Sequence, residues 1–169
     1  MSVRRRVWRV GENIDTDALA PGHAMKLGID GIKPFCLEGV RPDFAAGVRA
    51  GDVLVAGANF GIGSSREQAA SVLVALGVYA VIAPSYNGLY FRNAFNVGLL
   101  LLTCAHATTL GEGERVVINE HAQPWMVQGT DAPALACEPV PDFLLQRVRK
   151  GGLLNELKHR LARKTTDDA

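Results

Sequence analysis

Short apolar runs alternate with stretches of helical periodicity through the middle of the chain. The apolar runs have the length and composition of buried strands, and are Val53–Ala56, Val78–Ala83 and Leu99–Thr103. Between them, apolar residues recur at helical spacing in Ser65–Leu76 and Asn87–Val97. Gly77 and Gly98 follow these two segments, where a glycine commonly ends a helix. The resulting β-α-β-α-β order predicts right-handed crossovers over a sheet with a parallel core.

The two ends of the chain are patterned less strongly. Further strands are expected at Val7–Val10, Glu114–Asn119, Trp125–Gln128 and Ala134–Glu138. Helices are expected at Ile32–Leu37, Asp43–Val48, Pro141–Lys150 and Leu153–Ala162, with a loop at Pro21–Gly31 and a frayed tail at Arg163–Ala169. With 169 residues and no internal repeat, the chain is predicted to form one α/β domain, residues 1–169.

A glycine-rich stretch, Gly57–Ala70, joins the first of these apolar runs to the helix that follows it, and reads GANFGIGSSREQAA. This order of strand, loop and helix places free backbone N–H groups at a helix N-terminus, where anions are attracted. Its glycines (Gly57, Gly61 and Gly63) allow the backbone to bend tightly and to approach a ligand. The stretch therefore predicts an anion site.

The side chains of the stretch fit the same interpretation. Ser64 with Glu67 and Ser65 with Gln68 each have the spacing of a capping box. Arg66 adds a cation whose fork geometry suits a carboxylate or a phosphate. The alternative, that the stretch only makes a turn between a strand and a helix, remains open on spacing alone.

Two nucleotide-binding motifs are excluded. Arg66 stands where a dinucleotide fingerprint has its third glycine, and no acidic residue follows near Pro84–Tyr86 to hold a ribose. A phosphate-binding Walker loop requires a lysine before its serine or threonine, and this stretch has none.

The sequence NFGIGSSREQA resembles the signature of the small, "swivel" subunit of aconitase-type hydro-lyases such as 3-isopropylmalate dehydratase. The family form is close to NFGCGSSREHA, so the chain departs from it at Ile62 and Gln68. Other similar blocks are Asn13–Asp17, Ala83–Ala94 and Pro141–Leu153, so the resemblance runs over nearly the whole chain. It implies a swivelling β/β/α-type domain with a partly parallel sheet core, flanking helices and a C-terminal helical segment.

The resemblance also assigns roles to residues. It makes Ser64 the catalytic base that removes a proton beside a substrate carboxylate, and it makes Ser65 and Arg66 the groups that hold that carboxylate. Asn59, Gly61 and Gly63 are expected to line the substrate site. His23 lies in the Pro21–Gly31 segment, which resembles the family's mobile loop over the substrate; it can bind substrate, or it can simply be exposed to solvent.

A hydro-lyase of this kind also needs a Lewis acid to polarise the leaving hydroxyl, which the family supplies as a [4Fe-4S] cluster. Cys36, Cys104 and Cys137 are too scattered for a cluster ligand set or a disulfide framework, and are expected to be small core residues. The cluster is therefore expected on a large partner subunit, which makes this chain half of an enzyme. The alternative is a non-catalytic subunit that binds an anion or serves assembly. Ser64 discriminates between the two functions, because only catalysis needs its hydroxyl.

Composition and charge limit the kinds of partner that the chain can have. A net charge of +1 argues against nucleic acid or an acidic membrane as the main partner. No apolar stretch approaches the roughly 20 residues that span a bilayer, and the basic start of the chain is not followed by a sustained apolar run. We therefore expect a cytoplasmic protein. Isopropylmalate, methylmalate-type, dimethylmalate and homocitrate-type acids all remain possible substrates.

Overall fold

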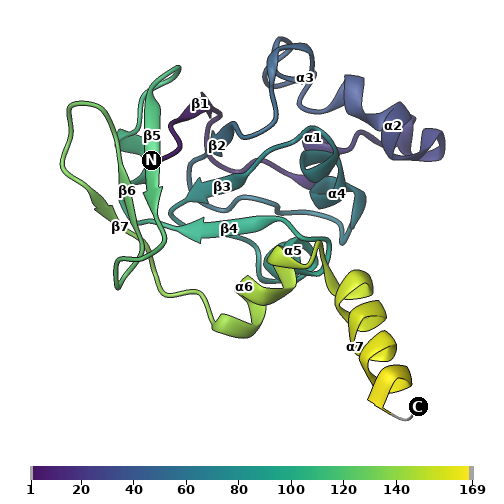
Figure 1. Ribbon diagram of the computed structural model, residues 1–169. Coiled ribbons are helices and arrows are strands. Elements are labelled where there is room, and N and C mark those ends of the chain that lie inside the picture. The colour runs from purple at the N-terminus through teal and green to yellow at the C-terminus, as the bar shows by residue number, and fades with distance from the viewer. Residues whose placement is uncertain (1, 168–169) are drawn as a thin grey trace.

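The computed structural model describes residues 2–167, whose seven strands form one mixed sheet in the order β4-β3-β2-β1-β5-β6-β7 (Figure 1). The strands are β1 (Arg5–Arg9), β2 (Val53–Val55), β3 (Ala80–Ala83), β4 (Leu100–Thr103), β5 (Arg115–Asn119), β6 (Met126–Gln128) and β7 (Leu135–Ala136). Strands β1 to β4 pair in parallel, whereas β5, β6 and β7 extend the sheet from β1 in antiparallel fashion. The predicted parallel core is thus confirmed.

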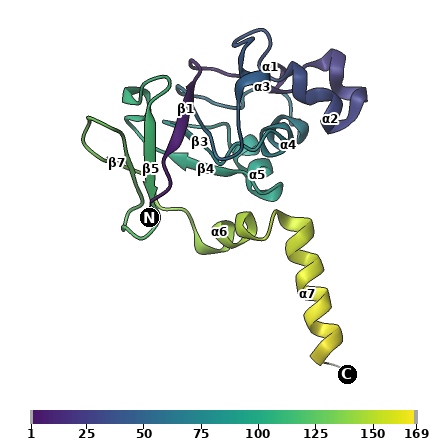
Figure 2. The same cartoon turned by 45° about the horizontal axis from the view of Figure 1, so that its top comes forward.

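The helices connect the parallel strands and form the end of the chain. They are α1 (Thr16–Leu19), α2 (Gly28–Ile32), α3 (Phe44–Gly47), α4 (Gln68–Ala75), α5 (Gly88–Asn96), α6 (Asp142–Arg149) and α7 (Leu153–Asp167), with 3₁₀ turns η1 (Gly22–Leu27), η2 (Lys33–Phe35) and η3 (Ala107–Thr109). Helix α4 contacts α1, α2 and α5, so segments before and after β2 join in one helical layer. Helix α7 extends away from the body of the domain (Figure 2).

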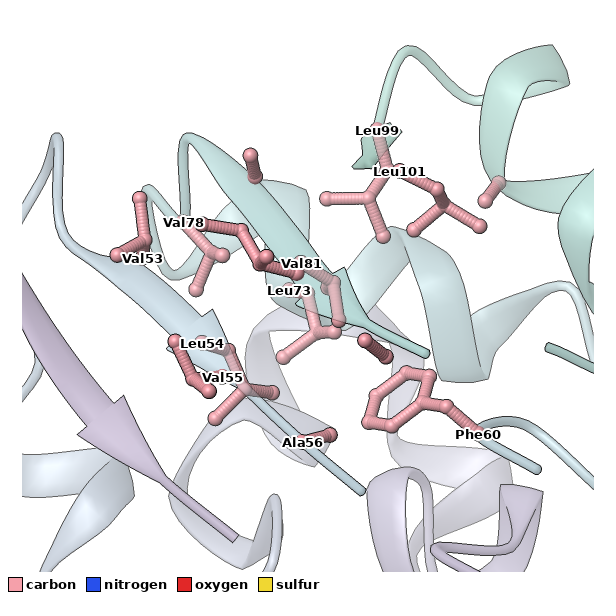
Figure 3. Packing of buried hydrophobic residues seen from close by; sticks show 14 of the residues in the cluster. Val53, Leu54, Val55, Ala56, Phe60, Leu73, Val78, Val81, Leu99 and Leu101 are labelled. Atoms are coloured by element: carbon pink, nitrogen blue, oxygen red, sulfur yellow. The ribbon is translucent and has the colours of Figure 1, made fainter. Parts of the chain in front are cut away.

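The core lies around β2 and β3, in which every residue is buried. This explains why both strands are continuous apolar runs instead of alternating ones: parallel strands covered on both faces need apolar residues on both. Leu73 of α4 packs with this cluster, and so does Phe60 of the loop after β2, as Figure 3 shows. Both side chains are fully buried.

Four expectations about local structure were wrong. Where a helix was expected at Ile32–Leu37, the structure has only the last residue of α2 and the 3₁₀ turn η2. Helix α4 begins at Gln68, three residues after Ser65, because the Arg66 N–H bonds to the Ser64 carbonyl (2.8 Å) in a tight turn. The expected loop over 21–31 is instead η1 and most of α2, since the fully buried Ala24 anchors it to the core. The expected frayed tail is helical through Asp167; residues 168–169 lie outside the described part.

Asp52, in the turn before β2, is the centre of a buried polar cluster that sequence patterning did not indicate. Its Oδ2 accepts hydrogen bonds from Arg6 (Nη2, 2.7 Å), the Trp8 indole (2.9 Å) and the Arg49 N–H (2.9 Å), and the residue is 6% exposed. Burial alone would raise the pKa of this carboxyl, but the Arg6 guanidinium and the two N–H donors hold it below its usual range.

We therefore expect Asp52→Ala to lower the free energy of unfolding by about 2–4 kcal/mol at neutral pH, since it leaves Arg6 and Trp8 without their acceptor. The folded-state pKa lies below the unfolded value of about 3.9, so this stabilisation is complete above that pH and is lost as the pH falls through the folded pKa. Urea unfolding of parent and variant should thus converge in acid. Asp131→Ala, the same change at an exposed carboxylate, is the matched control; equal effects of the two would contradict the argument.

Candidate active site

Three loops meet at the carboxyl ends of β1, β2 and β3, the edge at which open parallel sheets commonly bind ligands. They are residues 10–16, 56–67 and 84–87, and main-chain hydrogen bonds join them. The bonds run from the N–H of Gly57 to Gly11 O (3.0 Å), Asn13 to Ala58 O (2.8 Å), Gly61 to Ile14 O (2.7 Å), Thr16 to Ile62 O (2.9 Å), Phe60 to Ser85 O (3.1 Å) and Asn87 to Phe60 O (2.9 Å). The glycine-rich loop is therefore held on both sides.

Two asparagines at this junction have left-handed backbones, Asn13 with φ of 55° and Asn59 with φ of 60°. Asparagine tolerates this conformation better than most residues do. The Asn59 amide donates to the Asn13 Oδ1 (3.1 Å), and the Asn59 N–H donates to the Ser85 hydroxyl (2.9 Å). Asn59, a predicted site residue, thus fixes the loop on both sides, through its side chain to Asn13 and through its backbone N–H to Ser85.

Aromatic packing holds the loop from below. The buried Phe60 ring makes edge-to-face contacts with Tyr90 (centroids 5.4 Å apart) and Tyr86 (6.1 Å). Gly61 is also buried, with φ of +83°, and a Cβ there would overlap the Tyr90 ring. A glycine is therefore required at 61, both for this backbone conformation and for packing against Tyr90.

The turn formed by Gly63, Ser64 and Ser65 is exposed above this platform. Within residues 2–167, neither serine hydroxyl is hydrogen-bonded, and the three N–H groups of the turn donate to no protein acceptor. Neither expected capping box forms, because Glu67 is the N-cap of α4 and no side chain bonds there. The turn instead leaves two hydroxyls and several N–H donors open to solvent, an arrangement suited to an anion.

Arg66 lies beside the turn and reaches across to the chain after β1. Its Nη1 donates to the Asp17 Oδ1 (2.8 Å) and to the Ala20 carbonyl (3.0 Å). The hydrogen bond from Arg66, followed by one from the Gly22 N–H, lowers the pKa of the Asp17 carboxyl. Because the Asp17 side chain is 67% exposed, this ion pair is screened by water and opens at little cost.

His23 is the one predicted site residue that lies outside the glycine-rich loop. It follows Gly22 on η1, so it is near the Asp17–Arg66 pair. Its Nε2 is 2.6 Å from the Glu38 Oε1, and its ring packs edge-to-face on Phe35 (4.9 Å). In this conformation one ring nitrogen is already occupied.

Sequence reasoning missed two members of this arrangement. It did not identify Asp17 as the partner of Arg66, or Ser85 as the acceptor for the Asn59 N–H. The signal was present, since Asn13–Asp17 and Ala83–Ala94 both stood out as blocks, but the contacts join residues 26 and 49 positions apart in the chain.

The cysteines do not have the arrangement of a cluster ligand set. Cys36 is fully buried, and burial raises the pKa of its thiol to about 12. Cys104 and Cys137 are both buried and lie together, and the interaction with the Cys137 thiol lowers the pKa of Cys104. Among residues 2–167, no three His, Cys, Asp or Glu side chains group as metal ligands would. The donor set therefore does not fit a [4Fe-4S] cluster.

The parallel strands and the open serine turn define an aconitase-type domain, and the family model "Aconitase C-terminal domain" matches residues 45–107. The chain is 39% identical to the 3-isopropylmalate dehydratase small subunit of Syntrophus aciditrophicus, over 93% of this chain and 96% of that protein. It is 38% identical to the methanogen homoaconitase small subunit of Methanothermobacter thermautotrophicus, over 90% and 89%. A solved structure of 3-isopropylmalate dehydratase from Methanocaldococcus jannaschii matches with a TM-score of 0.90 and 32% identity, over 99% of each chain.

The chain therefore belongs to the family of aconitase-type dehydratase small subunits. The hydro-lyase class and the fold inferred from NFGIGSSREQA are both confirmed. Within the described residues 2–167, no helix is long and apolar enough to cross a membrane.

Proposed function

We propose that this chain is the small subunit of a hydro-lyase that dehydrates and isomerises a malate-type hydroxy-dicarboxylic acid, with 3-isopropylmalate as the leading candidate. One observation carries the proposal. The exposed serine turn lies beside Arg66 at the carboxyl ends of the parallel strands, in a chain that is 39% identical to a dehydratase small subunit. A subunit that only assembled or bound anions would need the N–H groups and the arginine, but not the hydroxyl of Ser64.

Ser64 is assigned as the base that takes the proton from the carbon next to a substrate carboxylate. A serine hydroxyl is a weak base, so its deprotonated form requires stabilisation by nearby positive potential. The unpaired N–H groups of the Gly63–Ser65 turn and the guanidinium two residues along supply it. The exposure of Ser64 leaves the oxygen accessible to a substrate carried by another subunit.

Ser65 and Arg66 are assigned to the substrate carboxylate. Because Nη1 of Arg66 already contacts Asp17 and Ala20, the carboxylate takes the remaining guanidinium nitrogens or displaces Asp17. Asn59, Gly61 and Gly63 shape the loop that presents these groups. His23 and its η1 segment, which continues from the Asp17–Gly22 contact, form the border of the site nearest the substrate side group.

The partner in this proposal is a large subunit, and the [4Fe-4S] cluster resides there. That cluster, when bound, polarises the hydroxyl that leaves. This chain contributes the base, the carboxylate clamp and the rigid platform of Phe60 and Tyr90 that holds them in position. No nucleic acid or membrane partner is required, and the protein acts in the cytoplasm.

Co-expression of this chain with its large subunit tests the proposal. The reconstituted complex should convert 3-isopropylmalate with a higher kcat/KM than methylmalate-type, dimethylmalate or homocitrate-type acids, and the isolated chain should be colourless and inactive. Higher kcat/KM on another of these acids would correct the substrate and keep the reaction. A complex that forms but turns over none of them would leave the binding subunit as the function.

A further inference from the structure

A cavity lies at the opposite ends of the parallel strands from the serine turn. It has a volume of about 400 Å³ and opens at the amino ends of β3 and β4, between the β5–β6 hairpin and α6. Leu100, Trp125, Leu145 and Val148 form its apolar wall. Leu100 and Leu145 are buried, while Trp125 and Val148 are half-buried, so the wall is open to a small ligand.

The polar side of this cavity carries one charge of each sign. Glu120 accepts a hydrogen bond from the Tyr79 hydroxyl through Oε1, and its Oε2 lies 4.0 Å from the Arg149 Nη2. At this separation the ion pair is at the limit of contact, and both side chains are partly exposed, at 33% and 61%. Glu120 can therefore still bind a positively charged group, and Arg149 can still bind a negatively charged one.

Tyr79 holds the Glu120 side chain in position. The Arg5 guanidinium stacks over the Tyr79 ring, 3.3 Å from its centroid. Burial, and then Glu120, raise the pKa of the Tyr79 hydroxyl to about 12, so it remains a donor to Glu120 at neutral pH. The Glu120 carboxylate is thus held at the cavity by a neutral hydrogen-bond donor.

These features select the ligand by its charges. An apolar acid would bind Arg149 through its carboxylate, and an apolar amine would bind Glu120 through its ammonium. Because Glu120 and Arg149 are only 4.0 Å apart, each such ligand would also lie close to a like charge. Only a ligand with both groups at one end satisfies both residues. We infer that this cavity binds a free α-amino acid with a large apolar side chain, its ammonium on Glu120, its carboxylate on Arg149 and its side chain against Trp125 and the leucines.

This site is separate from the one proposed for the dehydratase substrate, because the two lie at opposite ends of the same parallel strands. Ligand binding here should be independent of Arg66. Binding in this cavity does not depend on the reaction that the chain serves, and it can be measured on the isolated chain as well as on the complex.

The test is a calorimetric titration of the chain with L-leucine and L-phenylalanine, each beside its charge-deleted analogues: isovalerate and isoamylamine, 3-phenylpropionate and 2-phenylethylamine. The amino acids should bind at least about tenfold more tightly than either analogue, since each analogue loses one charge-assisted contact. Equal binding of an analogue, or no binding of either amino acid, would overturn the inference.

Variants locate the binding. Glu120→Gln keeps the acceptor for Tyr79 but removes the charge, and Arg149→Ala removes the cation; each should weaken binding by about tenfold or more. Glu138→Gln and Arg163→Ala make the same changes at exposed positions outside the cavity and should leave binding as it is. Arg66→Ala should also leave it unchanged. Binding that survives Glu120→Gln and Arg149→Ala lies elsewhere and refutes the site.

Discussion

Ser64→Ala should lower kcat of the reconstituted complex by about 10²–10⁴-fold, the contribution of a positioned general base. KM should change little, because Arg66 and the N–H groups of the turn still hold the carboxylate. The fold should be unaffected, since the hydroxyl is exposed and, among residues 2–167, bonds to no other group. Steady-state kinetics and urea unfolding of the same preparations measure the two effects separately.

The matched control for this change is Ser71→Ala, which removes the same hydroxyl from α4, outside the turn. Its kinetic constants should equal those of the parent complex. A Ser64→Ala complex that turned over within a few-fold of the parent would end the assignment of the base to this chain. The anion-binding subunit would then be the better description.

Arg66→Ala should raise KM by about tenfold to a hundredfold, the loss expected when a charged hydrogen-bonding partner is removed. Arg66→Lys should recover only part of this, because an ammonium cannot make the paired contacts of a guanidinium. The effect on kcat should be smaller than that of Ser64→Ala, since the clamp acts on bound substrate and transition state alike.

Asp17→Asn separates the clamp from a purely structural role of Arg66. The arginine also connects the serine turn to the segment after β1 through Asp17, and Arg66→Ala breaks this connection too. Asn at 17 weakens the same connection but leaves the guanidinium free for substrate. KM should therefore stay at or below the parent value in Asp17→Asn. A rise equal to that of Arg66→Ala would show that the ion pair, and not substrate binding, is what Arg66 provides.

The order of elements could be predicted because it depends on local patterns. Buried parallel strands such as β3 have unmistakable apolar runs, and Gly77 and Gly98 follow α4 and α5 as expected. The start of α4 could not be predicted, because two serine capping signals preceded it. The turn at Arg66 overrode both, and that turn is stabilised by contacts with Asp17 and Ala20, far away in sequence.

The candidate site was predicted in part for the same reason. The sequence motif identified Ser64, Ser65 and Arg66 as candidate site residues because they are contiguous in the chain. The role of Asn13 and Asn59 was hidden, since a left-handed backbone at a non-glycine residue leaves little trace in a single sequence. Gly61 was noticed as a bend in the loop, but its packing against Tyr90 was not, because nothing in the sequence places Tyr90 beneath it.

The contacts between the three loops of the candidate site are made largely by main-chain atoms. Ile62, for example, takes part through its carbonyl, which accepts from Thr16, and through its backbone pairing with Asp15. Any residue can supply that carbonyl, so the departure from the cysteine of the family motif leaves the loop's path intact. A scaffold built this way can exchange the side chains around the serine turn over evolutionary time without moving the turn. Such drift allows one ancestral shape to give rise to relatives with different substrate preferences.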